Sequence, residues 1–181
     1  MTARFLLLMI SLVIMPSIAI AIENGAASPV NEEYRLSTGD KIRIQVYNEE
    51  DLYLETRVND SGIISYPFLG AIKVGGMKPA QIEEYIASKL RGDYLIDPKV
   101  SVDIIEYRQF YVNGEVQAPG GFPFQPGITV RKAISVAGGF RERAARDQVF
   151  IIREGQAENS PVGLDEKVRP GDIITVEESF F

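Results

Sequence analysis

Short segments that alternate polar and apolar residues, separated by turn residues, are the feature that most limits how this chain can fold. In residues 41–46 every second side chain is apolar (Ile42, Ile44 and Val46), which is the pattern of a strand with one buried face. Residues 100–104 alternate in the same way, and Gly, Pro, Asn and Asp gather between such segments. The pattern predicts several short strands joined by tight turns.

Residues 34–107 are predicted to form the first of two small units. Pro79 suits the first turn of a helix, and Gly92 is placed to end it. The apolar face of this helix would consist of Ile82, Tyr85, Ile86 and Leu90, so we expect Tyr85 in the core. Strands are expected at 41–46, 56–60, 63–69 and 100–104. Strands combined with one helix indicate a compact α+β unit.

Residues 109–178 are predicted to form a second unit of short strands and one helix. Thr129 can cap a short helix, which Gly138 and Gly139 would end. Strands are expected at 110–112, 149–153 and 173–176, with an Asn-Gly turn signal between the first of them and the helix. The fold class is therefore α+β, in two small domains.

One short pattern occurs in both units. Leu36-x-x-Gly39-Asp40 precedes the first predicted strand, and Val168-x-x-Gly171-Asp172 precedes the last. Gly-Asp turns commonly precede strands, and we favour this interpretation over an internal repeat. The eight Tyr residues, in contrast, all lie between positions 34 and 111, so the two units present different aromatic surfaces.

The N-terminal residues 1–21 have the pattern of a secretory signal peptide. A basic start is followed by an apolar stretch, and Ala19 and Ala21 form a small-x-small cleavage site. A membrane anchor is the alternative, but a spanning helix needs about 20 apolar residues, and Pro16 interrupts this stretch. We expect cleavage after Ala21, a flexible lead-in at 22–33 and a soluble mature protein in the periplasm.

The sequence contains no His and no Cys. Their absence excludes His-based triads, His metal sites, thiolate nucleophiles, thiolate zinc sites and disulfides. It also removes the cysteine that a lipoprotein would acylate, so we expect no lipidation. The net charge of −6 argues against nucleic-acid binding, which requires a basic surface. We therefore predict no catalytic residue, no metal and no cofactor.

Two charged clusters are candidates for a functional site. The run Glu49-Glu50-Asp51 contains carboxylates, and a glycosidase needs two of them roughly 5–10 Å apart across a sugar. Three adjacent acids more often form a solvated loop, which is our interpretation. Arg141, Arg143 and Arg146 can contact an acidic polymer, but the acids among them favour a charged surface or a subunit contact.

Aromatic faces suit the apolar faces of pyranose rings, and the first unit is rich in Tyr. We predict as glycan contacts the surface residues Tyr47, Tyr53, Tyr66 and Tyr94. Trp, which often serves as a platform for sugars, is absent. Phe180 and Phe181 are interpreted as a frayed end rather than as a docking tip.

Two sets of motifs follow one another along the chain. The first set is Tyr34-Arg35-Leu36-x-x-Gly39-Asp40, Val58-Asn59-x-x-Gly62, Ile64-x-x-Pro67-x-Leu69-Gly70 and Pro98-x-Val100-x-Val102. The second set is Val112-x-Gly114-Glu115-Val116-x-x-Pro119-Gly120, Thr129-Val130-x-x-Ala133-Ile134-x-x-Ala137-Gly138-Gly139 and Arg169-Pro170-Gly171-Asp172. In this order they resemble the bacterial outer-membrane polysaccharide export proteins, with a polysaccharide export domain at 34–107 and an SLBB β-grasp domain at 109–178.

The resemblance implies a role for individual residues and for the whole chain. As structural turns of the family motifs it marks Gly39, Asp40, Gly62, Pro67, Gly114, Pro119, Gly120, Gly138, Gly139, Gly171 and Asp172. Members of the family typically form rings in the periplasm and export capsule or exopolysaccharide. This implies a homo-oligomer that handles polysaccharide, with an inner-membrane copolymerase as a partner.

The sequence departs from the longer members of the family in three respects. It has no lipidated Cys, it has a single SLBB-like unit, and it ends directly after the last predicted strand. We therefore expect it to depend on another protein to cross the outer membrane, for which a β-barrel is suited. A monomeric periplasmic glycan-binding module is the alternative function, and a carboxylate-based hydrolase is the least favoured one.

Overall fold

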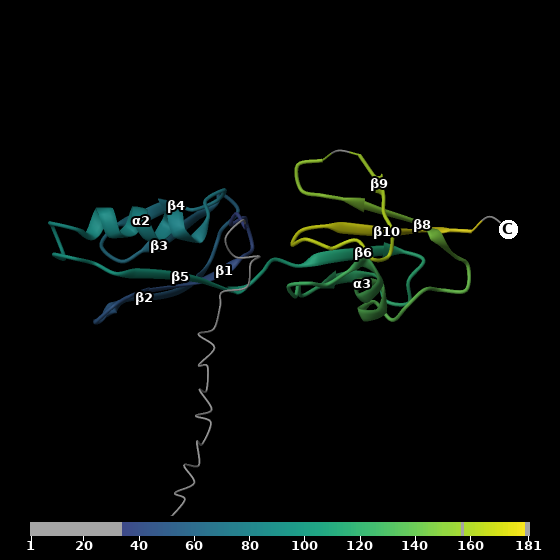
Figure 1. The fold of residues 1–181 in the computed structure, drawn as a ribbon, viewed down its shortest axis with the longest axis horizontal. Helices are drawn as coiled ribbons and strands as arrows, with labels where there is room; N and C mark the ends of the chain where they lie inside the picture. The colour runs from purple at the N-terminus through teal and green to yellow at the C-terminus, as the bar shows by residue number, and fades with distance from the viewer. Residues whose placement is uncertain (1–33, 157, 180–181) are drawn as a thin grey trace, which may run out of the picture.

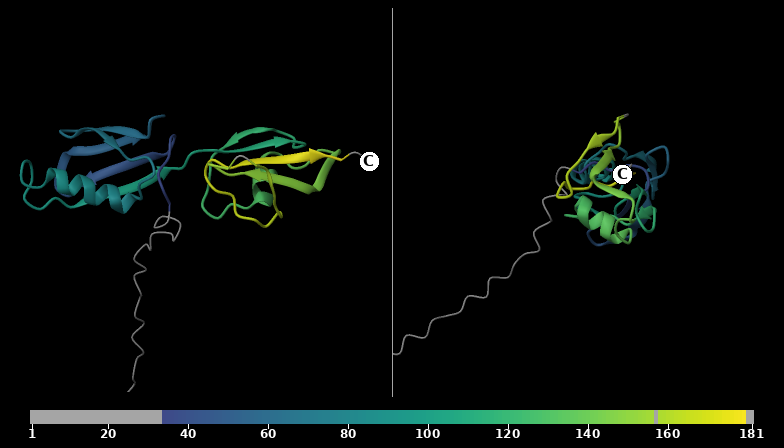
Figure 2. Two further views of the ribbon diagram at one scale, coloured as in Figure 1. Left: turned by 90° about the horizontal axis from the view of Figure 1, so that it is seen from above. Right: turned by 90° about the vertical axis from the view of Figure 1, so that its right-hand side faces the viewer.

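The structure is a computed structural model that describes residues 34–156 and 158–179, which form two α+β units placed end to end (Figure 1). Viewed along the long axis, the second unit lies in front of the first (Figure 2). The predicted α+β class is confirmed. The signal peptide with Ala19 and Ala21, the lead-in at 22–33 and the Phe180-Phe181 end lie outside the described residues. Within the described ranges, no helix is both long and apolar enough to span a membrane.

The first unit places a helix and a hairpin over one face of a three-stranded sheet (Figure 1). Strand β1 lies at the centre of this antiparallel sheet, between β2 and β5, and β3 pairs with β4 in a separate hairpin. The elements are β1 (Lys41–Val46), β2 (Glu49–Arg57), β3 (Ile63–Tyr66), β4 (Gly70–Lys73), α2 (Pro79–Leu90) and β5 (Val100–Glu106). As predicted from the alternation, Ile42 and Ile44 are fully buried. No element of the described residues covers the other face of this sheet (Figure 1).

Two predictions for the first unit are wrong. Strand β2 begins at Glu49 rather than at residue 56, so the acidic run belongs to a strand and not to a loop. Asn48 has a φ of 62°, a left-handed conformation that Asn tolerates, and it closes a tight turn in which Val46 pairs with Glu49. Tyr85 is 40% exposed instead of buried, and the Lys89 ammonium lies 5.7 Å from the centre of its ring. The buried residues of α2 are Pro79, Ile82, Ile86 and Leu90.

The second unit is a five-stranded mixed sheet with one helix against it. The strand order is β7-β6-β10-β8-β9, in which β6 and β10 are parallel and the other pairs are antiparallel. The elements are β6 (Phe110–Gly114), β7 (Gly120–Phe122), α3 (Val130–Val136), β8 (Ala144–Ile152), β9 (Ser160–Pro161) and β10 (Ile173–Glu178). The predicted Thr129 cap is confirmed, since its hydroxyl accepts a hydrogen bond from the Lys132 N–H.

Two strands of the second unit are longer than predicted. Strand β6 continues through Asn113 and Gly114, and β8 begins at Ala144 rather than at residue 149. At Gly114 a side chain is excluded, because an added Cβ would lie 2.0 Å from the Val176 carbonyl oxygen of β10 and because its φ is 81°. The Asn-Gly signal therefore marks a close approach of two strands instead of a hairpin turn.

Each unit buries its own hydrophobic core. The first core lies between the sheet and α2, and the second lies between the mixed sheet and α3. Asp40 and Asp172 are the buried charged residues among those described, with 0% and 1% exposure. Both belong to the short pattern that the two units share.

Candidate functional site

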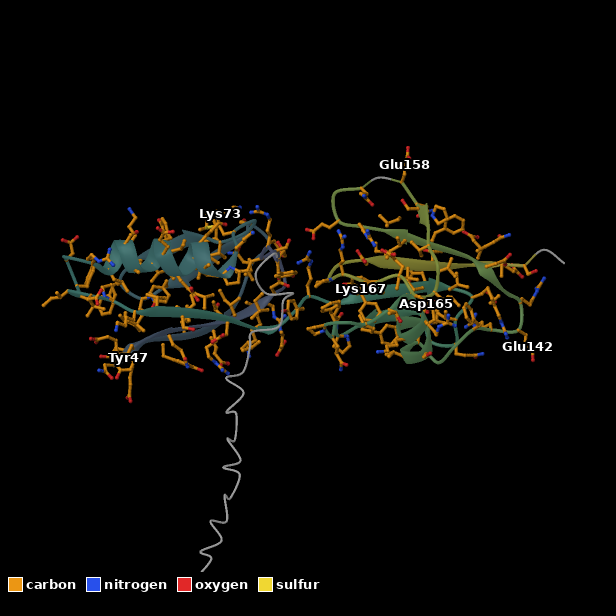
Figure 3. The ribbon with its side chains drawn as sticks, viewed as in Figure 1. Tyr47, Lys73, Glu142, Glu158, Asp165 and Lys167 are labelled. Atoms are coloured by element: carbon orange, nitrogen blue, oxygen red, sulfur yellow. The ribbon has the colours of Figure 1, made fainter. Side chains whose placement is uncertain are left out.

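A groove of about 780 Å³ lies at the end of the first unit, around the β1–β2 turn. Figure 3 shows Tyr47 at this end, away from the second unit. Tyr47 and Tyr53 line the groove, and their exposed fractions are 72% and 47%. The polar residues of its wall are Gln45, Asn48, Glu49, Glu50, Lys99 and Ser101. Two of the four predicted glycan contacts therefore lie together in one groove.

Hydrogen bonds on the open face of the sheet hold Tyr53 in place. The Tyr53 hydroxyl donates to Glu55 Oε1 at 2.7 Å, and Arg43 Nε donates to the same oxygen at 3.0 Å. These two bonds, from Tyr53 first and then from Arg43, lower the pKa of Glu55 to about 2. Glu55 is therefore ionised at neutral pH and acts as a fixed acceptor rather than as a proton donor.

The groove has the chemistry of a sugar-contact surface. Two exposed aromatic rings offer apolar faces, and amide, hydroxyl and ammonium groups offer hydrogen bonds to hydroxyls. Of the acidic run of β2, Glu49 and Glu50 belong to the wall of the groove, whereas Asp51 does not.

The other two predicted glycan contacts lie elsewhere. Tyr66 is only 2% exposed and its hydroxyl donates to the Leu52 carbonyl at 2.9 Å, so the prediction that it is a surface contact is wrong. Burial raises the pKa of Tyr66 to about 12. Tyr94 is 51% exposed but does not line the groove, and its ring packs against Phe68 with 5.5 Å between ring centres.

The three Arg residues that follow α3 contact groups of their own unit. Arg143 Nε lies 2.9 Å from a Glu178 carboxylate oxygen, and Arg141 Nη1 lies 4.0 Å from one of Glu115. The Arg146 guanidinium lies 5.7 Å from the centre of the Phe140 ring. These contacts fit a charged surface, and a role in contacts with polymer or with another subunit stays a prediction.

A second site lies at the junction of the two units, where sequence patterns indicated only turns. The buried Asp40 carboxylate accepts hydrogen bonds from the Ser37 N–H at 2.8 Å, the Tyr34 hydroxyl at 2.7 Å and the Arg108 N–H at 2.8 Å. Burial and the negative charge of Asp40 raise the pKa of Tyr34. A buried carboxylate is stable when donors surround it in this way.

Arg108 connects this carboxylate to the second unit. It lies between β5 and β6, and its Nη1 is 3.3 Å from Asp40 Oδ2 while its Nη2 donates to Glu154. The Ser37 hydroxyl also donates to Glu154, at 2.9 Å. Aromatic contacts extend the junction, since the Tyr107 ring packs edge-on against Tyr34 at 5.0 Å and against Phe124 at 5.3 Å.

The Gly-Asp turns of the two units both lie next to Arg108. An added Cβ at Gly171 would lie 2.8 Å from Arg108 Nε, and one at Gly39 would lie 3.4 Å from Arg108 Cβ. The Asp172 carboxylate accepts from the Arg169 N–H at 2.7 Å, as Asp40 accepts from Ser37. Sequence reasoning did not identify Arg108, and the repeated Gly-Asp pattern was the available signal for it.

The remaining predicted turn residues lie where the chain changes direction. Gly62 precedes β3, Pro67 lies in the β3–β4 turn, and Pro119 and Gly120 stand at the start of β7. Gly138 and Gly139 follow α3 with φ values of 83° and 89°. Among the described residues, no group of three or more acidic, His or Cys side chains is placed to hold a metal.

Comparison with known proteins adds two domain matches. Residues 28–105 match the family described as polysaccharide biosynthesis/export protein, and residues 109–165 match the SLBB domain.

Three curated relatives are similar to this chain. The exopolysaccharide production protein ExoF of Rhizobium meliloti is 35% identical over 70% of this chain and 34% of its own length. The EPS I polysaccharide export outer membrane protein EpsA of Ralstonia nicotianae is 25% identical, over 80% of this chain and 47% of that protein. The polysialic acid transport protein KpsD of Escherichia coli is 24% identical, over 78% of this chain and 26% of its own length. The matched region thus spans about a quarter to a half of these relatives.

Proposed function

The chain belongs to the polysaccharide biosynthesis/export family, and from that premise we propose that it is a periplasmic component of a capsule or exopolysaccharide export machine. The observation that carries the proposal is the pair of domain matches in one order, a polysaccharide export domain followed by an SLBB domain. The names of the relatives agree, since they describe exopolysaccharide production and polysaccharide export or transport.

We propose a passive mechanism without catalysis. Copies of the chain enclose an aqueous passage, in which hydrated polymer slides along surfaces that bind it weakly. A closed ring requires two different patches on each subunit, and the two unlike units provide them. An inner-membrane copolymerase would supply the driving force, and a β-barrel in the outer membrane would complete the path.

The groove at the β1–β2 turn supports a direct contact with polymer. Its two Tyr rings and polar wall face solvent at the end of the first unit. The same observation favours the second candidate function, a monomeric glycan-binding module. The two functions differ in assembly, because only the export component needs to form a closed oligomer.

Export in cells tests the proposal. A strain that lacks its own copy should recover extracellular polysaccharide when the wild-type gene is returned. The Tyr47→Ala, Tyr53→Ala double variant should restore less, whereas Tyr85→Ala removes an exposed Tyr of the same unit outside the groove and should restore export fully. If deletion leaves extracellular polysaccharide unchanged, the proposed function is wrong.

Light scattering on the mature protein separates the two candidate functions. We expect a discrete high oligomer, alone or with the membrane proteins encoded beside it. A strict monomer under all these conditions, combined with affinity for sugar, would favour the glycan-binding module.

A further inference from the structure

A cleft of about 1070 Å³ lies between the two units, next to Arg108. Arg35 and Ser37 form part of its wall on the first unit, and Lys167 and Arg169 do so on the second. In Figure 3, Lys167 lies in the half of the second unit that is nearer to the first. A ligand in this cleft would contact both units at once.

The wall of the cleft has a small excess of basic residues, in a chain whose net charge is −6. The basic residues of its wall are Arg35, Arg108, Arg153, Lys167 and Arg169. The acidic residues of its wall are Glu154, Asp165, Glu166 and Asp172. The basic residues therefore outnumber the acidic ones here, in contrast to the chain as a whole.

Each carboxylate of the wall already has a partner in the fold. Glu154 accepts from Arg108, and Glu166 lies 2.7 Å from Arg153 Nη2. Asp165 lies 3.1 Å from Arg131 Nη2, which is outside the cleft, and Asp172 accepts from a backbone N–H. The carboxylates are thus committed to groups of the protein itself.

Three basic residues of the wall form no ion pair with a described residue. Arg35 donates to the Gly76 carbonyl at 2.8 Å, and neither it nor Lys167 nor Arg169 forms an ion pair with any residue that the structure describes. All three side chains belong to exposed residues. They can therefore reach an anionic ligand without breaking an ion pair.

A second observation points to hydrogen-bond donors that lack an acceptor. Among the described residues, the buried side-chain nitrogens without a hydrogen-bond acceptor are Nε of Arg108 and Nε of Arg153. Both residues line the cleft. Buried donors are nearly always satisfied in native proteins, so two unmet guanidinium donors at one place mark a region that favours negative charge.

We propose that the cleft between the two units binds the carboxylates of an acidic segment of the exported polysaccharide. Guanidinium groups match carboxylates in a planar, two-point geometry, and Lys adds a mobile charge. Arg35 engages the segment from the first unit while Lys167 and Arg169 engage it from the second. The inference rests on the proposed function, because that function supplies a polysaccharide as the ligand.

Calorimetric titration of the mature chain tests this site. A tetramer of galacturonic acid should bind at low ionic strength, and added salt should weaken the binding because exposed charges are screened. The Lys167→Gln, Arg169→Gln variant removes two charged contacts. Its affinity for the acidic tetramer should be about tenfold lower than that of the wild type. A neutral cellulose tetramer should bind the variant and the wild type equally.

A matched variant controls for net charge. Lys89→Gln with Lys132→Gln removes two exposed positive charges, one from each unit, and neither residue lines the cleft. It should bind the acidic tetramer as the wild type does. Equal losses in the two double variants would overturn the proposal, because they would show a general effect of charge.

Two further arms separate this inference from its alternatives. If inorganic phosphate displaces the tetramer at equal concentration, the cleft is a site for small anions and the proposal is wrong. If the wild type restores export in cells but does not prefer the acidic tetramer, the inference fails while the proposed function stands. If the acidic tetramer binds as expected but deletion does not affect export, the proposed function is wrong, and with it the identity of the ligand as an exported polysaccharide, while the cleft remains a site for acidic glycans.

Discussion

The turns at residues 37–40 and 169–172 have the same local geometry but different surroundings. In both, a Gly with positive φ precedes a buried Asp, whose carboxylate accepts from the backbone N–H three residues earlier. Asp40 also contacts the Tyr34 hydroxyl and the Arg108 guanidinium. Asp172 forms no ion pair with any described residue, and burial raises its pKa.

The difference shows how one local motif acquires two roles. Next to Arg108, the carboxylate becomes part of the junction between the units, because a buried charge is favourable only when donors and an opposite charge surround it. In the second unit, the corresponding carboxylate, that of Asp172, mainly closes a turn before β10. The repeated sequence pattern specifies the turn, and the neighbouring side chains specify its role.

The largest expected loss of stability follows from the substitution of Asp40. Asp40→Ala should lower the free energy of unfolding by about 3–5 kcal/mol, because it leaves the partly buried Arg108 without its buried partner. Asp172→Ala removes a single charged acceptor from a backbone N–H and should cost about 1–2 kcal/mol. Denaturant unfolding measures both values, with the exposed Asp60→Ala as a control. Equal losses for Asp40 and Asp172 would contradict the assigned roles.

Arg108 should come next in the order of effects. Arg108→Ala removes the contacts with Asp40 and Glu154, and we expect a loss of about 2–3 kcal/mol in unfolding free energy. Arg108→Lys keeps the charge but cannot contact both carboxylates with a planar fork, so its loss should be intermediate. If Arg108→Ala is as stable as the wild type, Arg108 does not hold the junction.

Glu154 should affect the arrangement of the units more than their stability. It is an exposed partner of Arg108 and Ser37, and exposed ion pairs contribute about 0–1 kcal/mol. We expect Glu154→Gln to widen the distribution of distances between α2 and α3, with little change in unfolding. Spin labels on Lys89→Cys and Lys132→Cys measure this distance, since the natural sequence has no Cys. An unchanged distribution would show that the charge of Glu154 does not set the arrangement of the units.

The smallest effect is a dependence of stability on pH through Asp172. Burial raises the pKa of Asp172 above its value in the unfolded chain, so the Asp172 carboxyl binds a proton more tightly in the folded state. The resulting contribution to stability is present at pH below the unfolded pKa of about 3.9 and is lost as pH rises through the folded pKa. Asp172→Asn should remove this loss, so its stability relative to the wild type should increase over that interval. A parallel pH profile for the two proteins would contradict the role of Asp172.

Local patterns predicted much of the fold and little of the junction. Period-two alternation identified β1, and capping chemistry identified the start of α3 at Thr129. The start of β2 was missed because Glu49 and Glu50 have low strand propensity, which pairing with β1 overrides. Tyr85 was misassigned because it lies at the edge of the apolar stripe of α2, whose buried residues are Pro79, Ile82, Ile86 and Leu90.

The sequence by itself determined β1, β5 and β10, the two helices and the two Gly-Asp turns, because alternation, capping and positive φ are properties of neighbouring residues. Only the tertiary structure decided which Tyr residues share a groove, which Asp faces an Arg, and which cations face the cleft between the units. These relations join residues that are far apart in the chain, such as Asp40 with Arg108 and Arg108 with Glu154. Their energies depend on distance and burial in space, and the order of residues does not encode either one directly.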